Sequence, residues 1–109
     1  MPRDYKQHIE DILESISLIR EYVAGMDYTI FEDDRKTQDA VLRNLEVIGE
    51  AARALPEEIR DRSDYFPWAK IVALRNIVIH EYFGVNLRII WDIISNKLDE
   101  LEKVCRNLL

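Results

Sequence analysis

The stretch from Arg75 to Gly84, RNIVIHEYFG, holds the side chains best suited to chemistry. Its polar members include Arg75, Asn76, His80 and Tyr82. A guanidinium is permanently charged and binds phosphate through a planar fork, whereas an imidazole exchanges protons near neutral pH. One interpretation is therefore that these groups line a crevice whose occupant is an anionic substrate.

The segment around these residues is typical of a buried helix. From Trp68 to Leu74 it is apolar except for one Lys, and on a helix its apolar side chains point in every direction. Such a helix is buried within a bundle or at a subunit interface. Helical spacing places Arg75 and Tyr82 on one face and Asn76 and His80 on another.

A purely structural interpretation of the same residues stays open. Burying an Arg without a partner costs several kcal/mol, so Arg75 would pair with a carboxylate such as Glu46 or Glu50. Asn76 and His80 would then bond to backbone carbonyls. Composition and spacing alone favour this interpretation.

Hydrophobic periodicity predicts the elements that position these residues. The expected fold class is all-α, an antiparallel four-helix bundle with one extra short helix in a single domain spanning 1–109. The expected helices cover about 4–24, 34–55, 56–63 (the short one), 67–84 and 87–107.

Local signals mark the ends and contacts of these helices. Asp4 with Gln7 is similar to a capping box, Gly25 is a stop signal, and Asn86 is a good N-cap. The stretch DYTIFEDDRKTQ reads as a polar connector. Gly49, inside the second helix, indicates a close helix crossing.

The last helix is expected to be continuous. Its apolar stripe repeats at alternating spacings of three and four, and Cys105 lies on it as a buried structural thiol. The stripe comprises Leu87, Ile90, Ile94, Leu98, Leu101, Cys105 and Leu108.

Composition excludes several classes of protein. The formal charge of −6 over 109 residues disfavours electrostatic capture of DNA or long RNA, so any nucleic-acid contact needs a local basic site. Two His and one Cys lack the spacing of a zinc site. With no signal-peptide core and no membrane-length apolar run, we expect a cytoplasmic protein without a membrane contact.

Three segments, in order along the chain, resemble the HepT branch of the HEPN superfamily. The pattern Arg-x4-His-x-Tyr is met by Arg75, His80 and Tyr82, with the polar Asn76 after the Arg. TQDAVLRNLEVIGEAA (37–52) is similar to the second helix of this branch, and PWAKIVALRN (67–76) to the approach to its motif. The resemblance as a whole spans nearly the whole chain.

This resemblance implies a HEPN-like helical fold and a metal-independent endoribonuclease that needs no cofactor. The family's toxins act as homodimers, with the motifs of both subunits near a shared cleft, and cleave tRNA or mRNA. Their partner is an MntA-type nucleotidyltransferase antitoxin, which transfers AMP from ATP onto the motif Tyr, here Tyr82. The two form a type VII-like toxin–antitoxin module.

Carried onto this chain, the resemblance implies that Arg75 and His80 are catalytic. Asn76 and Glu50 would support them, Glu50 as a carboxylate beside Arg75. His80 suits proton transfer, and Arg75 suits the charge that develops on the phosphorane. The alternative is a non-catalytic helical module that only presents Tyr82 to a nucleotidyltransferase.

Overall fold

The computed structural model describes residues 3–76 and 86–109, and within these ranges every regular element is a helix. In chain order they are α1 (Tyr5–Tyr22), α2 (Tyr28–Glu32), α3 (Arg35–Ala54), α4 (Glu57–Arg60), η1 (Asp61–Ser63), α5 (Trp68–Val72), α7 (Leu87–Asn96) and α8 (Leu98–Leu108). The predicted all-α class and the short helix after Pro56 are confirmed. Within the described ranges, no helix is both long and apolar enough to cross a bilayer.

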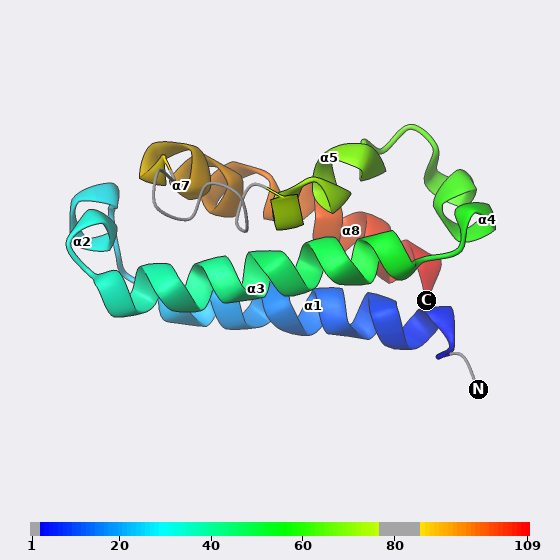
Figure 1. The fold of residues 1–109 in the computed structure, drawn as a ribbon, viewed down its shortest axis with the longest axis horizontal. Coiled ribbons are helices and arrows are strands. Elements are labelled where there is room, and N and C mark those ends of the chain that lie inside the picture. The colour runs from blue at the N-terminus through cyan, green and yellow to red at the C-terminus, as the bar shows by residue number, and fades with distance from the viewer. Residues whose placement is uncertain (1–2, 77–85) are drawn as a thin grey trace.

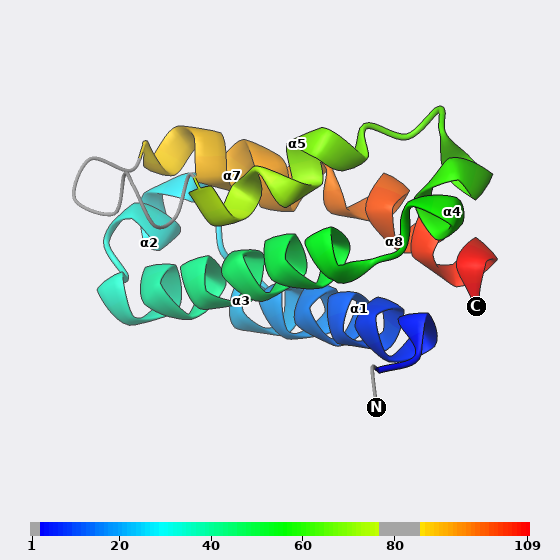
Figure 2. The same ribbon diagram turned by 45° about the vertical axis from the view of Figure 1, so that its right-hand side comes forward.

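Successive long elements run in opposite directions (Figures 1 and 2). Helix α3 returns beside α1, α5 runs back over α3, and α7 with α8 returns again, so the arrangement is an antiparallel bundle. The core follows the apolar stripes of α1, α3 and α8, because burying these stripes is the main force that assembles helices. Its fully buried side chains include Ile9, Ile12, Ile16, Ile19, Val41, Leu45, Ile48, Leu101 and Cys105.

Capping residues mark the ends of these helices, and the predicted signals at Asp4, Gly25 and Asn86 are confirmed. The Asp4 carboxylate accepts the N–H of Lys6 at 3.0 Å at the start of α1, and Asp34 accepts the N–H of Thr37 at 3.0 Å at the start of α3. Gly25, just beyond α1, has a φ of 77°, a left-handed conformation that favours glycine. Asn86 caps α7 by accepting the N–H groups of Arg88 and Ile89.

The prediction of a plain polar connector between the first two long helices is wrong. Residues Tyr28–Glu32 form α2, whose first turn is capped by the Asp27 carboxylate on the N–H of Ile30 at 2.9 Å. Phe31 is fully buried, and the side-chain amide of Gln38 donates to the carbonyls at the end of α2. One apolar anchor and one cap therefore order this segment despite its polar composition.

The prediction of one continuous last helix is also wrong. Lys97, with φ −109° and ψ −16°, interrupts it and separates α7 from α8. Ser95 and Asn96, which are weak helix formers, precede the break. The buried stripe nevertheless passes from Ile94 to Leu98, so the break changes the backbone and leaves the buried face intact.

The sequence predicts that the segment before the motif is buried within the bundle or at a subunit interface, and one chain buries only part of it over 68–76. Within 68–76 only one face is buried, formed by Trp68, Ile71 and Leu74. Lys70 and Asn76 are exposed. The apolar character of this segment thus exceeds what the bundle of one chain covers.

Cys105 is buried, as its place on the stripe predicts. Burial raises the pKa of its thiol to about 12, because removal from water penalises the thiolate. At neutral pH the group is therefore a neutral thiol inside the core, not a nucleophile.

Candidate active site

Helix α5 is held at its start by Trp68. The indole N–H of Trp68 donates to the hydroxyl of Ser63 at 3.2 Å, and its ring meets Phe66 edge-on, with centroids 4.9 Å apart. The chain turns at Ala73 and is helical again over 74–76. These contacts fix the segment that carries Arg75 against the rest of the bundle.

Gly49 allows α3 to approach this segment at the level of Arg75. A Cβ at position 49 would lie 2.8 Å from the backbone nitrogen of Arg75 and 3.3 Å from the carbonyl oxygen of Val72. The first of these distances is too short for any real contact. The predicted close crossing is confirmed, and its partner is the backbone around Arg75.

The residue after Gly49 places a carboxylate beside the guanidinium. Glu50 and Arg75 form an ion pair that joins Oε1 to Nε. The side chain of Arg75 is 36% exposed and that of Glu50 46% exposed, although the Nε atom itself is buried. Arg75 is therefore a partly exposed cation with a carboxylate on its inner side, and solvent reaches the remaining nitrogens.

This pair decides between the two carboxylates considered as partners of Arg75. Glu50 takes that place, and Glu46 instead pairs with Arg43 at 3.7 Å on the same helix. The Arg43–Glu46 pair was not anticipated, although opposite charges three residues apart on a helix indicate such a contact. Of these two carboxylates on α3, only Glu50 forms an ion pair with the segment that bears Arg75.

The described residues include only part of the motif. Asn76 is exposed, so its amide is available to a ligand or to a neighbouring side chain. His80 and Tyr82 lie outside the described residues. The structure brings Arg75, Asn76 and Glu50 together, and the roles expected for all five residues stay predictions.

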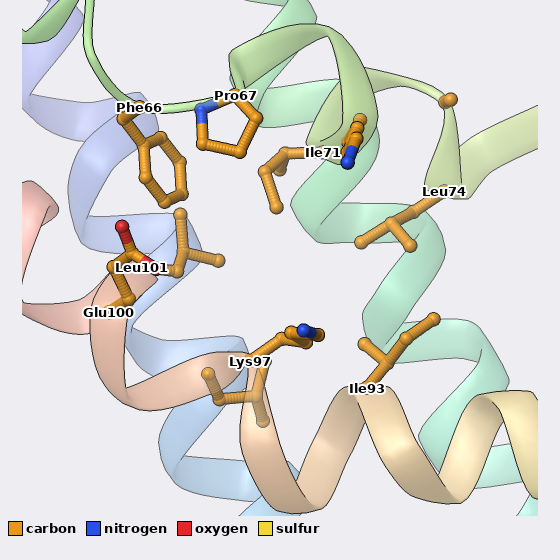
Figure 3. Close-up of a pocket in the computed structure, with 11 residues that line it drawn as sticks. Phe66, Pro67, Ile71, Leu74, Ile93, Lys97, Glu100 and Leu101 are labelled. Carbon is orange, nitrogen blue, oxygen red and sulfur yellow. The ribbon is translucent and has the colours of Figure 1, made fainter.

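A cavity of about 380 Å³ lies beside the segment that carries Arg75, between α5 and the junction of α7 with α8 (Figure 3). Ile71 and Leu74 face Ile93 and Lys97 across it, and its lining is mainly apolar. An apolar lining does not bind a phosphodiester, so we place the candidate site at the Arg75–Glu50 pair and not in this cavity.

No potential metal-binding group of three or more His, Cys, Asp or Glu residues occurs in the described ranges. Among the described residues, the ion pair at the candidate site consists of one guanidinium and one carboxylate. A guanidinium stabilises negative charge on a phosphoryl group and does not itself take up a proton. Proton transfer at this site would need a further group.

The helices form an all-α, HEPN-like bundle with an arginine–carboxylate pair beside the motif segment. The family model for HepT-like ribonucleases matches residues 12–108, so the chain belongs to that family.

Several similar proteins are named as ribonucleases, and they match this chain over nearly their whole lengths. A protein of Methanocaldococcus jannaschii named as a putative RNase is 41% identical over 99% of this chain and 93% of its own. Another putative RNase, from Caldanaerobacter subterraneus subsp. tengcongensis, is 42% identical over 99% and 94%. A probable ribonuclease HepT of Thermococcus cleftensis is 37% identical over 94% and 93%. No solved structure matches the chain.

The close crossing leads to a test of how Arg75 is positioned. Replacing Gly49 with Ala should lower the free energy of unfolding by about 1–2 kcal/mol, because the clash with the Arg75 backbone exceeds the gain in helix propensity. Urea denaturation followed by Trp fluorescence measures the loss. Gly25→Ala is the comparison, since nothing lies within 4 Å of a Cβ there and only its φ of 77° is unfavourable. Gly49→Ala should shift the native Trp emission and Gly25→Ala should not; equal stability of Gly49→Ala and wild type would contradict the close approach.

Proposed function

We propose that the chain is the toxin of a type VII-like toxin–antitoxin module, a metal-independent endoribonuclease that cleaves tRNA or mRNA in the cytoplasm. The observation that carries the proposal is the partly exposed Arg75–Glu50 pair, next to the motif segment of a chain that belongs to the HepT-like ribonucleases. The ribonuclease names of the relatives support it.

The proposed reaction assigns one task to each side chain. His80 removes the proton from the ribose 2′-OH, whose oxygen attacks the adjacent phosphorus. Arg75 stabilises the extra negative charge of the phosphorane, as a bidentate cation does best. The bond from phosphorus to the 5′-oxygen then breaks, and that oxygen takes up a proton. The products are a 2′,3′-cyclic phosphate and a 5′-OH.

Glu50 and Asn76 would act as supporting groups. A carboxylate in contact with Nε orients the guanidinium and leaves its terminal nitrogens for phosphate oxygens. Exposed Asn76 comes four residues before His80, so its amide can orient the imidazole or donate to a phosphoryl oxygen. In this proposal Glu50 and Asn76 position other groups and do not themselves transfer protons.

The catalytic role of His80 gives the first test. His80→Ala should lower the rate of RNA cleavage by about 10²–10⁴-fold, the usual contribution of general acid–base catalysis. The same substitution should relieve the growth arrest that follows expression without an antitoxin. Gel analysis of cleaved RNA, with identification of the end groups, measures the first effect, and circular dichroism checks the fold. Toxicity that persists in a folded His80→Ala variant would refute the assignment.

We also propose that the active form is a homodimer. The chain offers one His at the motif, whereas cleavage needs a base and an acid, and a two-fold axis supplies a second copy of His80. Val72 and Ala73 are only half-buried and Ala69 is exposed, so this segment retains some apolar surface for such an interface.

Dilution tests the dimer. Specific activity should fall when the protein is diluted below its dissociation constant, in parallel with the dimer fraction measured by analytical ultracentrifugation. A monomer that retains full ribonuclease activity would exclude the shared site.

Silencing would occur at Tyr82. An MntA-type nucleotidyltransferase would transfer AMP from ATP onto the Tyr82 hydroxyl: the tyrosyl oxygen loses its proton and attacks the α-phosphorus, and pyrophosphate leaves. The AMP group adds bulk and negative charge close in sequence to Arg75 and competes with RNA. The alternative function, a non-catalytic module that only presents Tyr82, predicts the same modification without any RNA cleavage.

Intact-mass spectrometry tests the modification. Incubation with the nucleotidyltransferase and ATP should add one or more AMP increments, and Tyr82→Phe should abolish them. Tyr65→Phe is the matched control, because Tyr65 is 70% exposed and lies outside the motif. Adducts that persist in Tyr82→Phe would show that another residue is modified. A parallel RNA cleavage assay distinguishes the toxin from the non-catalytic module.

A further inference from the structure

Helix α2 is docked onto α7 by three aromatic rings. The rings of Phe31 and Trp91 lie 5.1 Å apart, and those of Tyr28 and Trp91 meet edge-on at 6.4 Å. Phe31 is fully buried, whereas Tyr28 and Trp91 are half-buried. Tyr28 therefore lies at the border between core and solvent, beside α7 at the end of the bundle where α7 begins (Figures 1 and 2).

Arg88 covers the ring of Tyr28. Its Cζ atom is 4.2 Å from the ring centroid, a close cation–π contact. Arg88 itself is exposed, so the outer side of its guanidinium remains open to solvent. The result is a solvent-exposed cation held over an aromatic ring.

The electrostatic position of Arg88 is unfavourable for a purely structural residue. It lies in the first turn of α7, where the helix dipole disfavours a cation, and that turn contains no acidic residue. Within the described ranges, no carboxylate forms an ion pair with Arg88. Several other arginines do have such partners, namely Arg3, Arg20, Arg35, Arg43, Arg75 and Arg106.

We propose that Tyr28 and Arg88 form a stacking subsite for one nucleobase of a single-stranded RNA bound at the active site. This inference rests on the proposed function and deepens it. A base stacks readily on a guanidinium plane or an aromatic ring, and the guanidinium edges can bind a neighbouring phosphate. In a chain of net charge −6, the pair supplies the local basic site that RNA binding requires.

The chain itself limits how far this subsite can lie from the motif. Arg88 follows His80 by eight positions, so their Cα atoms are at most about 29 Å apart, a span of only a few nucleotides. The subsite would therefore hold a nucleotide within a few positions of the scissile bond. Its role is to position the substrate, and it would contribute to binding more than to the chemical step.

The competing interpretation is that Arg88 only offsets the acidic residues of the α2 region. Partial burial and the nearby Glu32 carboxylate raise the pKa of the Tyr28 hydroxyl, which is therefore protonated. In this interpretation Arg88 fastens α2 to α7, and its loss would change stability without changing the preference for a base.

Binding of an uncleavable RNA separates the two interpretations. The probe is a single-stranded oligonucleotide with 2′-O-methyl riboses, measured by fluorescence anisotropy on the full chain. A series with one abasic site at each position in turn should contain a position at which wild type loses about 10-fold in affinity. Arg88→Ala should bind the intact oligonucleotide about 10-fold more weakly and be insensitive to that abasic site. Arg88→Lys keeps the charge and should recover only part of the affinity, whereas Tyr28→Phe should behave as wild type.

Arg62→Ala is the matched control. Arg62 also lies over a tyrosine, Tyr5, at 5.9 Å, and it lies at the opposite end of the bundle. It should retain both wild-type affinity and the sensitivity to the abasic site. Thermal unfolding checks each variant, and Arg88→Lys replaces Arg88→Ala if the latter does not fold.

The outcomes distinguish this inference from the proposed function. Absence of any abasic-sensitive position, the same sensitivity in wild type and Arg88→Ala, or equal losses in Arg88→Ala and Arg62→Ala would overturn the stacking subsite. If unmodified RNA is still cleaved in these cases, only the inference fails. If wild type cleaves no RNA but shows the expected abasic pattern, the subsite stands and the ribonuclease proposal fails.

Discussion

The close contact between α3 and the segment 68–76 governs the geometry of the candidate site. Because position 49 has no side chain, the two backbones approach until a Cβ there would lie 2.8 Å from the nitrogen of Arg75. This approach brings the carboxylate of the next residue, Glu50, against the guanidinium. Moving the helices apart would leave the charged groups in place along the chain but would separate them in space. The chemistry of the site therefore depends on packing between backbones as much as on the charged side chains.

Much of the scaffold was predictable because a few strong physical signals agree with one another. The stripe from Ile9 to Ile19 and the caps at Asp4 and Asn86 indicate helices, and the structure confirms each of them. Gly49 predicted a close crossing because glycine inside a helix is otherwise unfavourable. The family was also recognisable from the sequence, since Arg75, His80 and Tyr82 form a motif with a defined spacing.

The features that were missed depend on interactions that sequence patterns weigh poorly. In the connector, burial of one ring, Phe31, outweighs the polar composition and produces α2. The break at Lys97 escapes a periodicity argument because the stripe continues from Ile94 to Leu98 across it. The pairing of Glu50 with Arg75 was anticipated, but spacing alone left Glu46 open as well, because the choice depends on which turn of α3 faces the crossing.

The Arg75–Glu50 pair also makes the candidate site selective toward anions. A free guanidinium would attract any polyanion, but here a carboxylate contacts its Nε atom. A phosphate that binds the terminal nitrogens does not displace Glu50, but the nearby negative charge repels it. A single phosphate contact is therefore weakened, whereas a ligand that makes several contacts at once offsets the repulsion. The same carboxylate that orients Arg75 therefore favours ligands that contact the protein at more than one point over single anions.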